Sequence, residues 1–244
     1  MITKELSMAQ VILDHQQLIP LLPRFNIKMG VGEASVEEVC KRHSVDVDFF
    51  LEICNSYIEE TFDAQNNLLV FSLDTVIDYL VNTHFYYTEI ALPELERQIH
   101  SLISGSDLSK EKKDLVITFF NDYKHDFLSH IQKEELEIIP YIRDLERQLK
   151  KSDPDQHFIQ KIHTYSINDF AREHDPLENS LTNLSKLIIK YLPPFKNWGL
   201  CNHILCDLSR LVKDLIDHAD IEDRVLIPRV AELEKELIEK SKQR

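Results

Sequence analysis

The stretch SHIQKEELEIIPYI at residues 129–142 decides the fold, because its pattern returns 88 residues later as DHADIEDRVLIPRV at residues 217–230. Both stretches read His, three residues, Glu, an acidic residue, three residues, Ile and Pro. Residues four apart lie on one face of an α-helix, one turn from each other. Each stretch therefore predicts a helix that directs an imidazole and a carboxylate toward a common centre.

The chain from about residue 72 onward shows helical spacing of its apolar residues throughout. Three short stretches interrupt this spacing: SGSD at 104–107, SDPD at 152–155 and LPPF at 192–195. In the second stretch, Asp153 is predicted to cap a helix, with Pro154 at the first helical position. Long helices joined by short connections pack as antiparallel neighbours. The sequence thus predicts an all-α fold in which residues 67–244 form an up-down four-helix bundle, with kinks near Pro93 and Pro176.

Residues 1–66 predict a small helical module ahead of this bundle. Ser35 and Glu38 have the spacing of a capping box that opens a short helix, and a second short helix is expected after Asp46. The polar residues 62–67 are interpreted as a linker. Two short helices and a turn are also typical of DNA-binding modules, but the acidic composition and the lack of a Lys/Arg cluster argue against that function.

Composition narrows the possible settings and partners. The net charge of −14 disfavours binding to nucleic acid, because a phosphate backbone requires a basic surface. The four cysteines contain no CxxC pair and are too few for a disulfide framework. The N-terminus lacks the features of a signal peptide, and no apolar run reaches the roughly 18 residues of a membrane span. We therefore expect a cytoplasmic protein with neither a nucleic-acid nor a membrane partner.

The four predicted long helices each bring a histidine to a similar height. In an antiparallel bundle, residues at equal distances from a turn lie at the same level. With the turns placed near residues 106, 153 and 194, the histidines His84, His130, His174 and His218 lie 20 to 24 residues from each adjacent turn. Glu134 and Glu222 lie one helical turn beyond two of them. The other seven histidines show no such register.

A metal would explain why six such groups meet inside a bundle, since a buried cluster of imidazoles and carboxylates is otherwise costly. Six ligands exceed the four of a tetrahedral zinc site and suit two ions bridged by Glu134 and Glu222. This mixture of ligands is compatible with iron, manganese or zinc. His125 points about 140° away from His130 around the helix and is expected at the surface. Glu178, four residues after His174, lacks the following Ile-Pro and is interpreted as a surface or outer group.

The two paired motifs resemble those of the hemerythrin-like, HHE cation-binding domain. They are most similar to its branch of di-iron iron–sulfur cluster repair proteins, also called regulators of cell morphogenesis and nitric oxide signalling. THFYYTEIALPELERQI, with His84, resembles the opening helix of that branch, and AREHDPLENSLTNL, with His174, resembles its third ligand helix. The resemblance covers roughly residues 72–232. Family members often carry Cys-Cys-Gly-Gly where this chain has MGVG at 29–32, with only Cys40 nearby, so thiol chemistry by the leading module is not expected.

The resemblance implies a non-haem di-iron centre with an oxo or hydroxo bridge. It implies terminal ligands at His84, His130, His174 and His218 and bridging carboxylates at Glu134 and Glu222. It also implies a role in nitrosative and oxidative stress, in which the protein supports repair of damaged iron–sulfur proteins by donating iron or by binding NO or O2.

Three alternatives remain open at this point. The chain is either a repair protein, a module that binds or senses O2 or NO without repair, or an enzyme such as a nitric oxide reductase or peroxidase. The enzyme would need an electron supply that no motif reveals. A metal-free structural bundle is disfavoured by the register of the four helices, and a homodimer is compatible with the sequence.

Overall fold

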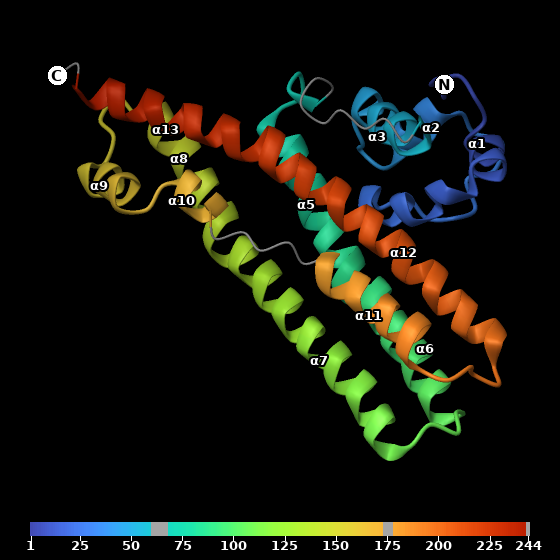
Figure 1. The fold of residues 1–244 in the computed structure, drawn as a ribbon. Coiled ribbons are helices and arrows are strands. Elements are labelled where there is room, and N and C mark those ends of the chain that lie inside the picture. The colour runs from blue at the N-terminus through green and yellow to red at the C-terminus, as the bar shows by residue number, and fades with distance from the viewer. Residues whose placement is uncertain (60–67, 173–177, 243–244) are drawn as a thin grey trace. The chain divides into compact units, whose positions relative to one another are not determined.

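The regular secondary structure of the protein is helical in the residues that its computed structural model describes, which are 1–59, 68–172 and 178–242 (Figure 1). The only β pairing among these residues is an isolated bridge between Ser7 and Ser35. The predicted all-α class is confirmed. The chain divides into two compact units, of which unit 1 comprises Met1–Tyr86 and Asp220–Leu226, and unit 2 comprises Tyr87–Ala219 and Ile227–Arg244. The predicted linker at 62–67 and domain boundary at residue 66 lie outside the described residues.

Unit 1 consists of short helices and one longer helix. Its elements are α1 (Met8–Asp14), the 3-10 helix η1 (Gln16–Phe25), α2 (Val36–Arg42), α3 (Val47–Glu59), α5 (Leu73–Tyr86) and the π turn η4 (Glu222–Leu226). The expected capping box opens α2, because Ser35 Oγ accepts a hydrogen bond from Glu38 N–H at 3.2 Å and the Glu38 carboxylate accepts one from Ser35 N–H at 3.0 Å. Asp46 accepts from Phe49 N–H at 3.0 Å, so the second expected helix is confirmed as α3.

In the core of unit 1, aromatic side chains pack η1 against α3 and α5. The ring of Phe25 lies 5.0 Å from that of Phe50 and 5.3 Å from that of Tyr79, measured between centroids. Arg24 is buried beside them, where its guanidinium donates to Tyr79 Oη at 3.4 Å and lies 4.8 Å above the ring of Tyr86. Aromatic pairs at these separations add to the stability that burial alone provides. These contacts hold α5 to η1 and α3 within unit 1.

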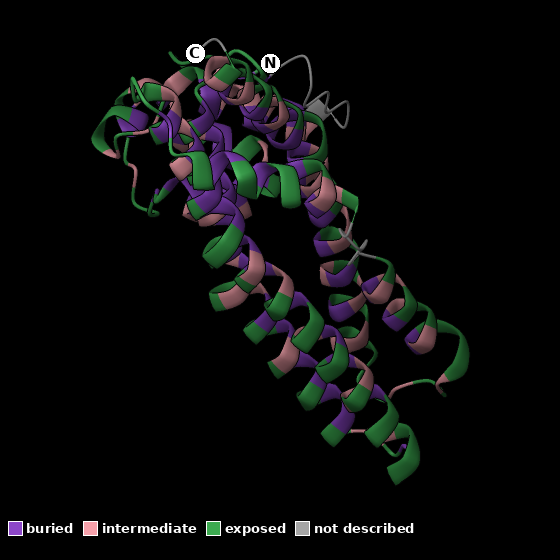
Figure 2. Cartoon of the chain, turned by 90° about the vertical axis from the view of Figure 1, so that its left-hand side faces the viewer, coloured by how far each residue is buried: buried purple, intermediate pink, exposed green. Residues whose placement is uncertain are grey.

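Unit 2 contains the longest helices. Its elements are the π turn η2 (Tyr87–Ala91), α6 (Leu92–Ser104), α7 (Lys110–Lys133), the π turn η3 (Glu134–Ile138), α8 (Ile139–Lys150), α9 (Gln156–Thr164), α10 (Ile167–Arg172), α11 (Glu178–Tyr191), α12 (Trp198–Ile221, ending in unit 1) and α13 (Ile227–Lys242). Within this unit α7 lies beside α6 and α11, and α8 lies beside α13 (Figure 1). Buried residues follow the helix faces that meet, as the purple stripes of Figure 2 show.

The third long segment departs from the prediction of a single helix. α9 ends at Thr164, and Tyr165 adopts an extended conformation. Ser166 then starts α10, because its N–H and its hydroxyl both donate to Asp169 Oδ2, at 2.9 Å and 2.8 Å. Local capping of this kind competes with continuation of the helix. Pro176, where a kink was expected, lies outside the described residues.

The predicted cap of this segment is also wrong by two residues. Asp155, and not Asp153, caps α9 by accepting a hydrogen bond from His157 N–H at 2.9 Å. The backbone N–H of Asp155 donates to the side chain of Gln148 at 3.0 Å, which holds the connection to the end of α8. The connection from α8 is therefore complete before α9 begins.

Among all the described helices, none is long and apolar enough to cross a membrane.

Candidate metal centre

Four of the six predicted ligands are buried residues on three helices. His84 lies near the end of α5, Glu134 is the first residue of η3, and His218 and Glu222 follow each other by one turn from α12 into η4. Their exposed fractions are 1% for His84, 3% for Glu134, 9% for His218 and 4% for Glu222. Imidazole and carboxylate groups are rarely this buried without a partner that satisfies their charge and hydrogen-bonding capacity.

The four side chains converge. One ligand atom from each of His84, Glu134, His218 and Glu222 lies within 4.8 Å of the corresponding atoms of the other three. Opposite ligands of a metal ion with bonds of about 2.1 Å are separated by about 4.2 Å. The buried group therefore has the size needed to hold a metal ion.

The chemistry of the four donors also fits a cation. Two buried carboxylates this close repel each other when both are ionised, and removing each from water adds a desolvation cost. A divalent cation reverses the sign of that interaction and accepts electron pairs from the imidazole nitrogens. Two imidazoles with two carboxylates form a donor set that suits iron, manganese or zinc rather than the all-oxygen sites of calcium or magnesium.

The remaining two predicted ligands are placed differently. His130 lies one helical turn before Glu134, with Nε2 3.1 Å from Glu134 Oε1, and its side chain is 18% exposed. It therefore adjoins the four buried residues through Glu134 and stands on their more accessible side. His174 lies outside the described residues, as does the side chain of Glu178. His125 is exposed, as its position on the helix predicted.

Each of the three ligand-bearing helices widens into a π turn at the level of the cluster. The turns η2, η3 and η4 end two residues before Pro93, Pro140 and Pro228 respectively. In η3 the N–H of Ile139 donates to the carbonyl of Glu134, five residues earlier instead of four. A proline inside a helix lacks an N–H, and its ring clashes with the carbonyl four residues before it. A wider turn moves that carbonyl aside and keeps the helix continuous.

These π turns explain why the repeated motif includes the proline. Glu134 and Glu222 open their turns, and each stands six residues before its proline. Such turns occur frequently at functional sites, where they change the direction of one or two side chains. At Pro93, where a kink was expected, the structure has the π turn η2. The turns at Pro140 and Pro228 were not expected from the sequence, although the shared Ile-Pro was the available signal.

Tyr87 is a buried residue in contact with the cluster, and it is not among the predicted ligands. Its ring meets that of His218 edge-on, with centroids 5.7 Å apart, and that of Phe127 at 5.8 Å. Its hydroxyl donates to the backbone carbonyl of Asp214 at 3.2 Å. Tyr87 therefore fixes the side chain of His218 and one turn of α12 together. Its position three residues after His84 was the available signal, since residues three apart share a helix face.

The leading module offers no activated thiol. Burial, with a smaller contribution from nearby Asp46, raises the pKa of the Cys40 thiol to about 12. Burial also raises the pKa of the Cys54 thiol. Because the thiolate is the reactive form, both side chains behave as small apolar residues near neutral pH. This agrees with the expectation drawn from the missing Cys-Cys pair.

No protein-family model matches this sequence, and no curated protein matches it.

Proposed function

We propose that the chain is a hemerythrin-like, non-haem di-iron protein that supports the repair of damaged iron–sulfur clusters under nitrosative and oxidative stress. The observation that carries this proposal is the convergence of four buried ligand atoms, from His84, Glu134, His218 and Glu222, within 4.8 Å of one another. The repeated His-x-x-x-Glu motif supports the family, and the presence of both motif glutamates in the convergent group supports their assignment as metal ligands.

The proposal includes an up-down four-helix bundle as the scaffold. Its four segments would be α5 with α6, α7 with α8, α9 to α11, and α12 with α13. The short turn between α6 and α7 and the contacts of α7 with α11 favour this arrangement within unit 2. It also includes a cytoplasmic setting, damaged iron–sulfur proteins as partners, and a possible homodimer.

The residues at this site would have different roles. Bound iron would supply reversible redox chemistry and positions for NO or O2. Glu134 and Glu222 would hold the ions by their carboxylates, and the histidines would complete the ligand set, His130 from its more accessible side. Tyr87 is buried, is packed on the buried Phe127, and would keep bulk water from the face of His218 that it contacts. A modest number of protein ligands for two ions favours iron that can be released to an acceptor.

Metal analysis after anaerobic purification tests the centre. We expect about two irons per chain, because the resemblance implies six protein ligands that suit two ions. Zinc alone, or no metal, contradicts the proposal, and a single iron contradicts its dinuclear form. Transfer of iron to an apo iron–sulfur protein tests repair, with the Glu134→Gln/Glu222→Gln variant as a control that should transfer none.

A second candidate is a module that binds or senses O2 or NO without repair. The buried ring of Tyr87 beside His218, itself packed on Phe127, favours it, because an apolar surrounding protects a bound diatomic ligand. This function predicts reversible spectral changes on ligand addition, with no loss of iron to an acceptor. The same transfer assay therefore separates the two functions.

A further inference from the structure

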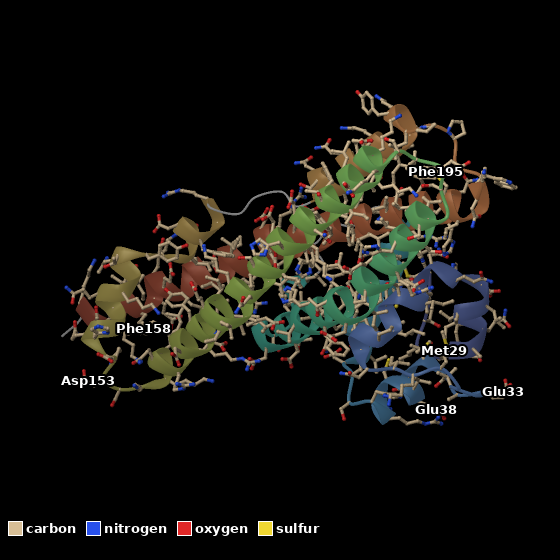
Figure 3. The ribbon with its side chains drawn as sticks, turned by 90° about the horizontal axis from the view of Figure 1, so that it is seen from below. Met29, Glu33, Glu38, Asp153, Phe158 and Phe195 are labelled. Carbon is tan, nitrogen blue, oxygen red and sulfur yellow. The ribbon has the colours of Figure 1, made fainter. Side chains whose placement is uncertain are left out.

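One end of unit 2 exposes aromatic side chains that the metal centre does not use. The end is formed by two connections, from α6 to α7 and from α11 to α12, which the ion pair between Lys196 and Asp107 joins. The side chains of Tyr191 and Trp198 are each 71% exposed, and that of Ile189 is 65% exposed. Phe195 lies in the turn between α11 and α12 at this same end (Figure 3). Soluble surfaces rarely gather large apolar side chains at one place without a binding function.

The charge at this end is opposite to that of the whole chain. Residues 105–114 and 186–198 together hold six lysines and three acidic residues, a net charge of +3 in a chain of −14. The remaining residues therefore carry −17. Of the lysines, Lys110, Lys112, Lys186, Lys190 and Lys196 are exposed. The ligand chemistry that this combination fits is an anionic surface that also accepts aromatic side chains.

We propose that this lysine–aromatic end, defined by residues 105–114 and 186–198, docks on the headgroup region of an anionic lipid bilayer. Tryptophan and tyrosine are the side chains that settle at a bilayer interface, and clustered lysines attract acidic headgroups. The surface is made of two connections and helix ends rather than a groove, which suits a broad, deformable interface better than a peptide. A second copy of the chain fits this end less well, because binding it through an acidic surface would pair two different faces, an arrangement that forms rings or open filaments and not a two-fold dimer.

The acidic remainder of the chain does not prevent this contact. At physiological salt, charges farther apart than about 8 Å are largely screened. α7 alone runs about 36 Å from this end, at 1.5 Å per residue over its 24 residues. The lysines at the end therefore dominate its interaction with a surface. The sequence-based expectation of no membrane partner was based on the absence of an apolar run long enough to span a bilayer. A peripheral contact needs no such run, so the proposal departs from that expectation.

Co-sedimentation of the full chain with lipid vesicles tests this inference. We expect binding to vesicles of phosphatidylcholine with about one quarter phosphatidylglycerol, weak binding to phosphatidylcholine alone, and release as salt is raised. The variants Tyr191→Ser/Trp198→Ser and Lys186→Glu/Lys190→Glu should each lower the partition coefficient about tenfold or more. Helical circular dichroism and the unfolding temperature should stay unchanged, because these side chains are exposed.

Matched substitutions elsewhere provide the controls. Leu13→Ser removes an equally exposed apolar side chain from α1, and Lys150→Glu/Lys235→Glu reverses two exposed lysines in α8 and α13. These variants should bind vesicles like the unaltered chain. The inference is overturned if the chain ignores anionic vesicles or if the two end variants bind as well as the controls. It is also overturned if Tyr191→Ser/Trp198→Ser instead converts a dimer to a monomer in light scattering, since a second copy would then occupy this end.

Discussion

The ring of Tyr87 meets the imidazole of His218 edge-on at 5.7 Å, while its hydroxyl donates to the backbone carbonyl of Asp214 at 3.2 Å. Asp214 lies one helical turn before His218, so a single side chain holds both the backbone and the ring of this ligand helix. The contact comes from η2, immediately after the helix that carries His84. Tyr87 is thus a positioning residue for the buried cluster.

Substitution of Tyr87 separates its two contacts. Tyr87→Phe keeps the ring and loses the hydrogen bond, so we expect a loss of about 1 kcal/mol in the free energy of unfolding and little change in metal affinity. Tyr87→Leu loses the aromatic contact with His218 as well, and we expect metal affinity to fall about tenfold. Denaturant unfolding and metal titration measure the two effects. Equal metal affinity in both variants would show that the ring does not position His218.

The two buried glutamates should oppose folding when no metal is bound. Replacing both in Glu134→Gln/Glu222→Gln removes their mutual repulsion and most of their desolvation penalty, so the metal-free protein should become more stable. The same variant should lose bound metal and with it the stabilisation that metal gives, about 2.7 kcal/mol at a hundredfold excess over the dissociation constant. Unfolding with and without a chelator measures both terms.

A matched change in an exposed residue controls for this result. His125→Gln lies on the same helix as His130 but faces solvent, and it should alter neither metal content nor stability. A Glu134→Gln/Glu222→Gln protein that is less stable than the unaltered chain in the presence of chelator would contradict the proposed repulsion.

The helical class and the shared face of each motif's histidine and glutamate could be predicted because both depend on the spacing of residues along a helix. Residues four apart must share a helix face, whatever the helix packs against. His218 and Glu222 needed only that rule and the buried face of their helix. The place of His84 was predicted by a further argument, from the distance of each histidine to the adjacent turns. The structure brings His84 close to Glu134, His218 and Glu222. The up-down order of the four segments stays a prediction.

Other features could not be predicted because they depend on local competition between hydrogen bonds. Ser166 and Asp169 end one helix and start another, although the apolar spacing continues through them. Gln148 holds Asp155 and so delays the start of α9. The π turns depend on how a proline ring is accommodated, which the spacing of apolar residues does not report. Contacts between distant segments, such as Tyr87 with Asp214, have no local signature at all.

The prolines that follow the π turns should be needed for the metal site more than for folding. Pro140→Ala and Pro228→Ala restore an N–H and remove the ring, so an ordinary α-helical turn becomes possible at Glu134 and Glu222. We expect unchanged helix content and a metal affinity about tenfold weaker, equivalent to about 1.4 kcal/mol. Circular dichroism and metal titration test this. Pro194→Ala, in an exposed connection, is the control, and an affinity as strong as the control's would contradict the role given to the turns.

A buried carboxylate outside the set of candidate ligands provides a test of pH dependence. Glu234 of α13 accepts hydrogen bonds at Oε1 from Tyr141 Oη at 2.5 Å and from Ile167 N–H at 2.8 Å, so it ties α10 to α8 and α13. The ring of Tyr141 stacks on that of Phe158 with centroids 5.5 Å apart. Burial raises the pKa of Glu234, the two hydrogen bonds partly offset this, and nearby Asp169 raises the pKa further.

The direction of that shift fixes the sign of its effect on stability. The folded protein holds the proton of Glu234 more tightly than the unfolded chain, so its contribution is complete below the unfolded pKa and is lost as pH rises through the folded pKa. Glu234→Gln keeps an oxygen acceptor but cannot ionise. The free energy of unfolding of the unaltered chain should therefore fall relative to that of Glu234→Gln as pH rises from about 4 to about 8. Glu232→Gln, exposed on the same helix, should follow the unaltered chain at every pH. A constant difference between Glu234→Gln and the unaltered chain across this range would mean that Glu234 has the same pKa folded and unfolded, and that burial and hydrogen bonding cancel at this site.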